Sequence, residues 1–294
     1  MQKITPHLWF DTQAREAATF YTSTFKNSKI ESSTVLHNTP SGDCDFVTIN
    51  LLGQQFMLLS AGPYFKFSPA VSFLVACDTK EEVDELWAKL SEGGKAMMEL
   101  GSYPFSERYG WTADKYGLSW QIMYMCDRKS KQRIIPTLMF VGDVCGRAEE
   151  AVNFYTTVFH DTTIDHFMRY GAGDTPDKEG TIRHAGFTLE NIDFAAMDSA
   201  REHNFTFTEA ISFMVHCETQ EEIDYYWEKL SADPKSEQCG WLKDKFGLSW
   251  QVIPDRMDRM LQDKDPEKVA RVTKTFLQMK KFNLQVLENA YEGK

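Results

Sequence analysis

Two stretches of twelve residues decide the fold: GWTADKYGLSWQ at 110–121 and GWLKDKFGLSWQ at 240–251. Nine of the twelve positions are identical, which chance does not supply. The period is about 130 residues, the size of a domain, so the chain is a duplicated domain and not a solenoid of short repeats. Other matched blocks are 4–8 with 134–138, 20–25 with 154–159, and 70–73 with 210–213.

Each copy follows one plan of strands and helices. Alternating apolar residues predict a strand at 4–10, and apolar residues at helical spacing predict a helix at about 13–25. Strands follow at 29–36, 45–52 and 55–60. The order then repeats, with a strand at 70–77, a helix opened by the capping box Thr79–Glu82, and three more strands. Each copy is therefore predicted to be β-α-β-β-β twice, an α+β fold.

The duplication predicts a first domain at 1–126 and a second at 133–254, followed by a helical tail at 255–294. Asp265-Pro266-Glu267 is a helix start signal within the tail. An apolar stripe after it predicts that the tail packs against the body, with a partner-binding helix as the alternative; the stripe is Val269, Val272, Phe276 and Met279.

Composition excludes several classes of function. The formal net charge of −11 disfavours nucleic acid as a partner, because an acidic surface repels phosphates. No apolar run approaches the roughly 20 residues that cross a membrane. The six cysteines form no C-x-x-C pair and no signal-peptide pattern is visible, so we expect a cytoplasmic protein. No glycine-rich dinucleotide or methyl-donor loop is visible, so no cofactor is expected.

The motifs ITPHLWF at 4–10, AVSF at 70–73, EEVD at 81–84 and the repeated twelve-residue block resemble the vicinal-oxygen-chelate superfamily. This superfamily includes glyoxalases, extradiol dioxygenases and bleomycin-resistance proteins. Within it, the chain resembles the PhnB-like group, often labelled as 3-demethylubiquinone-9 3-methyltransferase domains. The resemblance implies that each domain forms a cup-shaped mixed sheet with helices outside and a small-molecule ligand inside. The two domains would make an internal pseudo-dimer, and the sequence does not decide whether two chains also form a homodimer.

Strand alternation indicates which side chains face into such cups. Leu118, Trp120 and Ile122 should face the helices, so Ser119 and Gln121 face the cup. By the same pattern His7 faces inward, and we expect it to share one hollow with Gln121. The residues expected to line the cups are His7, Trp9, Thr48, Ser72, Trp111, Ser119, Gln121, Thr137, His184, Ser212, His216, Cys239, Trp241 and Gln251.

Metal-dependent members of the superfamily place His, Glu or Gln on four strands of the cup. The first copy offers His7 and Gln121, but Ala70 stands at the fifth-strand position. The second copy has Thr137 in place of His7; His184, His216 and Gln251 could approach one another, without a standard ligand spacing. Two donors, one of them a neutral amide, do not hold a divalent ion tightly, so no metal is expected.

Several other polar residues are better explained by structure than by catalysis. Glu81 and Glu82 suit the first turn of a helix, where carboxylates favour the dipole. Asp114 and Asp244 precede a turn glycine and suit a hairpin. Cys239 is a candidate nucleophile without a neighbouring base in the sequence. Trp111 and Trp241 suit either the core or a pocket wall.

Three functions therefore remain. The expected one is a metal-free protein that binds a small molecule. The alternatives are an enzyme of the glyoxalase, dioxygenase or transferase type acting on a small organic substrate, and a structural module whose copies pair around vestigial pockets.

Overall fold

The computed structural model describes residues 2–128 and 130–294 and confirms an α+β fold with two tandem copies and a helical tail. The first copy contains β1 (Ile4–Phe10), α1 (Ala14–Thr24), β2 (Lys29–Thr39), β3 (Gly42–Leu51), β4 (Gln54–Ser60), β5 (Val71–Cys77), α2 (Lys80–Leu90), β6 (Lys95–Tyr103), β7 (Ser106–Ala113) and β8 (Ser119–Tyr124).

The second copy and the tail complete the chain. The second copy contains β9 (Ile134–Phe140), α3 (Ala148–Val158), β10 (Thr163–Arg169), β11 (Ile182–Leu189), β12 (Ile192–Asp198), β13 (Ile211–Cys217), α4 (Gln220–Leu230), β14 (Trp241–Lys243) and β15 (Ser249–Pro254). The tail contains α5 (Met257–Leu261), α6 (Pro266–Phe276) and α7 (Leu284–Glu292).

Three of the four modules have the predicted order β-α-β-β-β, and the fourth is one strand short. In the first copy nineteen residues separate Leu90 from Gly110, whereas nine separate Leu230 from Gly240. Nine residues, among them Pro234, leave no room for a counterpart of β6. The prediction of a full second module in the second copy was therefore wrong at this strand.

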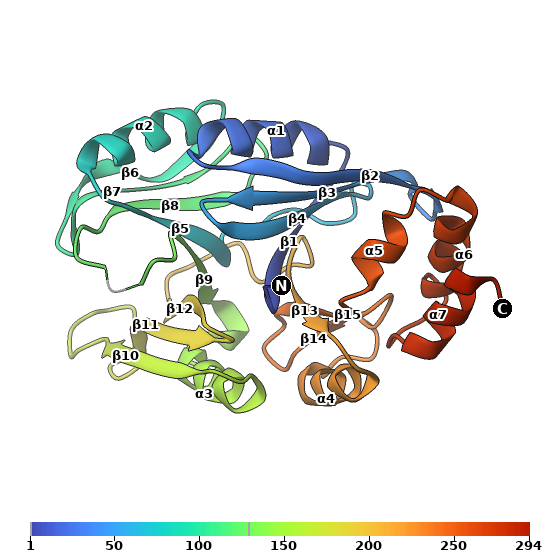
Figure 1. The fold of residues 1–294 in the computed structure, drawn as a ribbon. Helices are drawn as coiled ribbons and strands as arrows, with labels where there is room; N and C mark the ends of the chain where they lie inside the picture. Colours follow the sequence, from blue (N-terminus) through green and yellow to red (C-terminus); the bar gives the residue numbers. More distant parts are fainter. Residues whose placement is uncertain (1, 129) are drawn as a thin grey trace.

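The modules combine across the two copies, which the sequence did not predict. Sheet A has the order β14-β15-β13-β1-β4-β3-β2, and sheet B has the order β10-β11-β12-β9-β5-β8-β7-β6 (Figure 1). Each sheet therefore takes one module from each copy, instead of each domain closing its own cup. The junctions are antiparallel: β1 pairs with β13 from Ile4↔Val215 to Leu8↔Ile211, and β5 pairs with β9 from Val71↔Leu138 to Val75↔Ile134.

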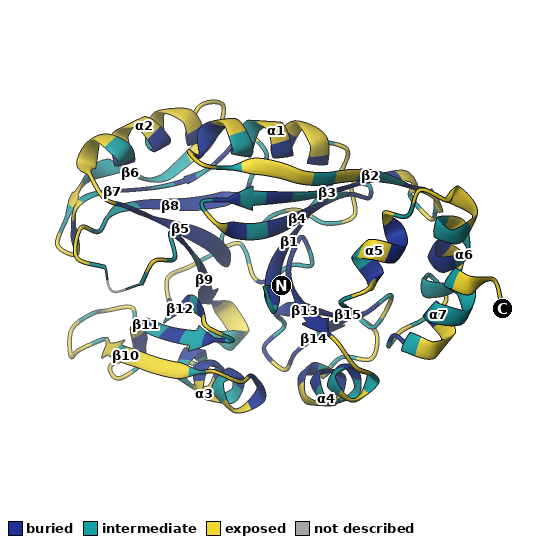
Figure 2. Cartoon of the chain, in the orientation of Figure 1, coloured by how far each residue is buried: buried dark blue, intermediate teal, exposed yellow. Residues whose placement is uncertain are grey.

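One face of each sheet is covered by helices, and the core lies between them. The helix α1 packs on β3 and β4, while α2 packs on β7 and β8. The helices are buried on the side that faces the sheet and exposed on the outer side, and the edge strands β2 and β10 carry many exposed residues (Figure 2). The faces of sheets A and B opposite the helices are here called cup A and cup B.

The repeated twelve-residue block builds a buried carboxylate anchor in each copy. One oxygen of Asp244 accepts hydrogen bonds from the Tyr155 hydroxyl at 2.7 Å and the Trp250 indole at 2.9 Å. The other oxygen accepts the backbone N–H groups of Phe246 and Leu248. Asp114 makes the same four contacts in the first copy. These residues tie a helix to the last hairpin, so the block is repeated for structural reasons.

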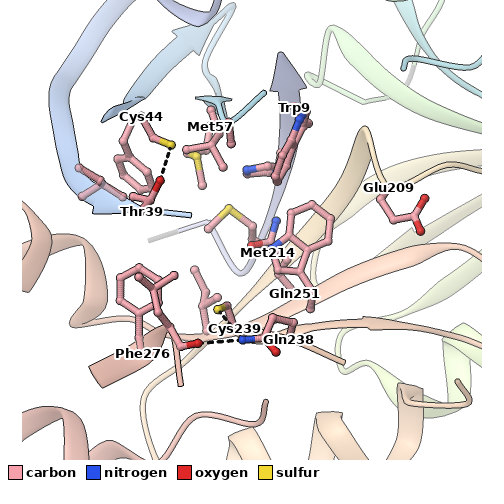
Figure 3. Close-up of a pocket in the computed structure, with 18 of the residues that line it drawn as sticks. Trp9, Thr39, Cys44, Met57, Glu209, Met214, Gln238, Cys239, Gln251 and Phe276 are labelled. Atoms are coloured by element: carbon pink, nitrogen blue, oxygen red, sulfur yellow. Dashed lines mark hydrogen bonds between the residues drawn. The ribbon is translucent and has the colours of Figure 1, made fainter. Parts of the chain in front are cut away.

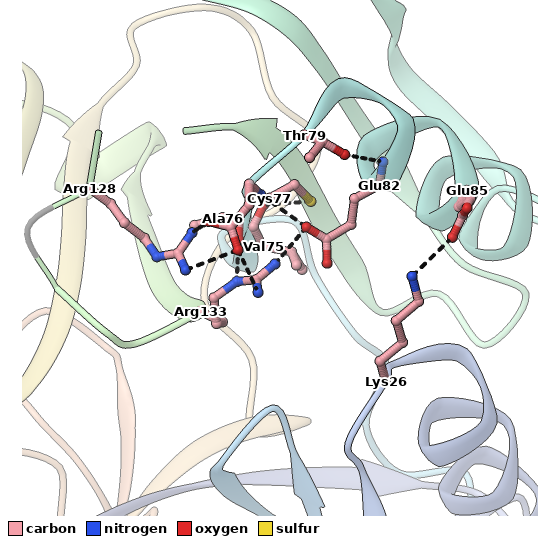
Figure 4. A network of polar contacts seen from close by, with 10 residues as sticks. Lys26, Val75, Ala76, Cys77, Thr79, Glu82, Glu85, Arg128 and Arg133 are labelled. Carbon is pink, nitrogen blue, oxygen red and sulfur yellow. Dashed lines mark hydrogen bonds and ion pairs between the residues drawn. The ribbon is translucent and has the colours of Figure 1, made fainter. Parts of the chain in front are cut away.

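Two matched ion pairs connect the copies at the start of β1 and β9. Lys3 contacts Glu222 at 3.0 Å, and the corresponding Arg133 contacts Glu82 at 2.8 Å. Arg133 also donates to the carbonyl of Ala76 beside the cap of α2 (Figure 4). Glu82 and Glu222 accept hydrogen bonds from the backbone N–H groups of Asp78 and Glu218, just before the N-caps of α2 and α4, which agrees with a role at the helix start.

The tail packs against sheet A and occupies the place that β6 has in sheet B. The backbone N–H groups of Cys239 and Gly240 donate to the carbonyls of Met279 and Lys280 at 2.8 and 2.7 Å. At the other end of the sheet, α6 lies against β2. None of the helices in the described residues is long and apolar enough to cross a membrane.

Replacing the buried anchor should destabilise the fold. Asp244→Asn replaces one carboxylate oxygen, which accepts hydrogen bonds, with an NH2 group that faces the same donors. Buried hydrogen bonds to charged groups contribute about 1.5–3 kcal/mol each. We expect the free energy of unfolding, measured in urea, to fall by at least about 2 kcal/mol. The control is Asp143→Asn on an exposed turn, expected to change it by less than about 0.5 kcal/mol. Equal stability of the two variants would contradict the anchor.

If the chain is divided between its two copies, the two fragments should stay bound to each other. If residues 1–128 and 130–294 are produced as two fragments in one cell, we expect them to co-purify, because both sheet junctions lie between the fragments. Produced alone, residues 1–128 should self-associate or unfold, since the edges of β1 and β5 lose their partners. A stable monomer of 1–128, detected by ultracentrifugation, would contradict this arrangement.

Candidate functional site

A cavity of about 670 Å³ lies between cup A and the tail (Figure 3). The sheet contributes its concave face, and the tail contributes side chains from α5, α6 and the segment that leads to α7. Most of the lining is apolar or aromatic. The lining includes His7, Trp9, Met57, Met214, Cys239, Trp241 and Gln251 from the sheet side, and Met257, Leu261, Phe276 and Phe282 from the tail.

His7 is the most unusual polar residue of this cavity. It is fully buried (0% exposed), and neither ring nitrogen has a hydrogen-bond partner among the described residues. Its neighbours on the adjacent strands are Met57 and Ser212. Burial lowers the pKa of His7 to about 3, so the imidazole is uncharged at neutral pH. An uncharged imidazole offers one N–H donor and one nitrogen acceptor to a bound molecule.

Two tryptophans form the wall beside His7. The Trp241 ring stands edge-on to His7, with centroids 5.1 Å apart, and to Trp9 at 6.0 Å. The Trp9 indole donates to the carbonyl of Gly62 at 2.8 Å, which fixes its ring. Trp241 is therefore a pocket wall, one of the two roles left open by the sequence.

Sulfur atoms of Cys44, Met57, Met214 and Cys239 also reach the cavity (Figure 3). Burial raises the pKa of the Cys239 thiol and that of Cys44 above the ordinary value. Both thiols are therefore protonated at neutral pH, which disfavours Cys239 as a nucleophile.

Three other expected cup residues belong to sheet A without lining the cavity. Ser212 accepts a hydrogen bond from Gln251 Nε2 at 2.9 Å. His216 contacts the Thr5 hydroxyl at 3.1 Å, and burial lowers its pKa to about 4. Thr48 lies on β3 opposite Met57.

The remaining expected residues lie in sheet B. His7 and Gln121 therefore do not share one hollow, and this expectation was wrong because the modules pair across the copies. His184 contacts His166 at 2.9 Å on β11 and β10, so it does not approach His216 or Gln251 in sheet A. The expected residues in sheet B are Ser72, Trp111, Ser119, Gln121, Thr137 and His184.

The metal that the superfamily implies does not fit the donors of cup A. His7 is flanked by a thioether and a hydroxyl, and Gln251 adds a neutral amide. Across residues 2–128 and 130–294, no group of three or more His, Cys, Asp or Glu side chains is arranged to hold an ion. These donors therefore do not form the ligand set that a divalent ion needs.

The sequence did not identify the part of the cavity that the tail supplies. Met257, Leu261, Phe276 and Phe282 lie opposite the sheet, far from it along the chain. The signal was present in two places: the stripe that includes Phe276, and the shortened segment before Gly240, which leaves an edge for the tail to cover.

Comparison with known proteins agrees with this fold. The model of the 3-demethylubiquinone-9 3-methyltransferase family matches residues 2–123 and 132–253, so the chain belongs to this family and contains its domain twice. A PhnB protein from Bacillus cereus is 43% identical over 42% of this chain and 100% of its own, with a TM-score of 0.40. The PhnB-like resemblance is thereby confirmed. No curated protein matches the sequence.

Two longer structures share the fold of the whole chain. Glyoxalase I from Zea mays is 10% identical, covers 89% of this chain and 97% of its own, and has a TM-score of 0.54. A protein from Bacillus subtilis described as a dioxygenase is 11% identical, with a TM-score of 0.52. The match covers 98% of this chain and 94% of that protein's chain. At this identity the likeness shows a shared fold alone.

The buried imidazole should make stability depend on pH. The unfolded chain protonates His7 near pH 6.5, whereas the folded chain does so only near pH 3. Stability is therefore fully present above pH 6.5 and is lost as the pH falls, by up to about 1.4 kcal/mol per pH unit from this residue. We expect His7→Leu to lose less stability than the native protein between pH 7 and 5 in urea titrations. An unchanged slope in His7→Leu would contradict the assignment.

Proposed function

We propose that this protein binds a small organic molecule in cup A, without a metal ion. The observation that carries the proposal is His7, which is fully buried at the cavity with both ring nitrogens unpaired. Leaving a buried polar group without a partner costs about 1–3 kcal/mol. A bound molecule with a hydroxyl, carbonyl or amine group would satisfy it.

The size and lining of the cavity support the same function. Small-molecule sites typically enclose about 300–1,000 Å³ and combine apolar walls with a few polar groups. Cup A has about 670 Å³, with His7 and Gln251 among tryptophan, methionine and phenylalanine side chains. Methionine side chains are flexible, so this lining adapts to the shape of its occupant.

Binding can be tested with N-phenyl-1-naphthylamine, an uncharged dye whose fluorescence rises in apolar sites. We expect the native protein to bind it and Met214→Trp, which fills cup A, to bind it at least about tenfold more weakly. The matched control is Met168→Trp, because Met168 is exposed on β10, the edge strand of sheet B, where the added ring meets solvent. It should bind the dye as the native protein does.

Two outcomes would contradict the proposal. One is the absence of dye binding by the native protein; the other is equal binding by Met214→Trp. Treatment with EDTA should leave the affinity unchanged, and its loss would contradict the metal-free part.

A further inference from the structure

The duplication provides an internal comparison of cups A and B. In cup B the polar groups satisfy one another. Gln121 Nε2 donates to Ser72 at 2.8 Å, and Gln121 Oε1 accepts from the Tyr109 hydroxyl at 2.7 Å. Ser119 accepts from the Trp111 indole at 2.8 Å, and the Thr137 hydroxyl donates to a backbone carbonyl.

In cup A the same framework is present but incomplete. Gln251 Nε2 donates to Ser212 at 2.9 Å, which repeats the bond of Gln121 to Ser72. Within the described part of the chain, no group donates to Gln251 Oε1, and Ser249 has no partner. His7, at the position of Thr137, is also unpaired.

The difference at the glutamine oxygen comes from one aromatic side chain. Tyr109 is buried (4% exposed), and its phenol hydroxyl donates a hydrogen bond to Gln121 Oε1. The residue before the matched glycine in the second copy is Cys239. Cys239 and Gly240 have φ of 51° and 83°, and their N–H groups bond to the tail. The chain turns away at this point, so the cavity of cup A remains where cup B holds Tyr109.

The geometry points to a phenol as the ligand of cup A, with one phenol bound per chain. The phenol hydroxyl donates a hydrogen bond to Gln251 Oε1, as the Tyr109 hydroxyl donates to Gln121 in cup B. This rests on the proposed function and adds the chemical class of the ligand. The phenol oxygen retains lone pairs that accept the ring N–H of His7, and the aromatic ring meets Trp9 and Trp241. Cup B carries the same group within its own sequence and therefore needs no ligand.

The test compares 4-phenylphenol with 4-methoxybiphenyl, which keeps the rings and the oxygen but has no O–H to donate. Calorimetric titration of the native protein should give one site per chain and about tenfold tighter binding of the phenol, as one buried hydrogen bond predicts. Gln251→Met should weaken the phenol by about that factor and leave the ether nearly unchanged. The matched Gln121→Met should preserve the preference.

A second variant tests the same bond from the other cup. Tyr109→Ala empties cup B beside Gln121, so 4-methylphenol, which is the tyrosine side chain itself, should raise the unfolding temperature of this variant more than toluene does. Equal effects of the two would overturn the inference.

The outcomes for the two proposals are distinct. Equal affinities for phenol and ether, two equivalent sites per chain, or an unchanged preference in Gln251→Met would overturn the phenol inference while dye binding in cup A stands. If neither the dye nor the two biphenyls bind, the proposed function fails as well.

Discussion

Two antiparallel strand junctions determine the rest of this structure. β1 pairs with β13, and β5 pairs with β9, so each sheet is complete only when one module comes from each copy. The ion pairs of Lys3 with Glu222 and of Arg133 with Glu82 reinforce the two junctions from their ends. The cups therefore belong to the interface between the copies and not to either copy alone.

Joining the copies in one chain allowed the two cups to become different. In an assembly of identical subunits any substitution would enter both cups, whereas here Tyr109 and Cys239 can differ. In cup B, Gln121, Ser119 and Thr137 all have hydrogen-bond partners. In cup A, Gln251 keeps its bond to Ser212, but His7 and Ser249 have no partner among the described residues. The tail contributes to the asymmetry because it covers cup A alone.

Much of the fold could be predicted from sequence, and the combination of modules could not. Alternation in 118–123 correctly oriented Trp120 toward the helices and Gln121 toward a cup, because strand periodicity is a local property. Which module completes a sheet depends on edges that have no local signature, so His7 and Gln121 were assigned to one hollow although they lie in two. Phe276 and Phe282 were missed as cavity residues for the same reason: they reach cup A from the end of the chain.

The order of the strands has a consequence for synthesis. Sheet B is built from one continuous stretch, residues 71–198, whereas sheet A joins residues 4–60 to residues 211–254. Because domains form as they leave the ribosome, sheet B can assemble midway through translation. The strands β1 to β4 must wait, with one edge of β1 unpaired, until residues 211–254 have emerged. Chaperone contacts during biogenesis should therefore concentrate on residues 4–60.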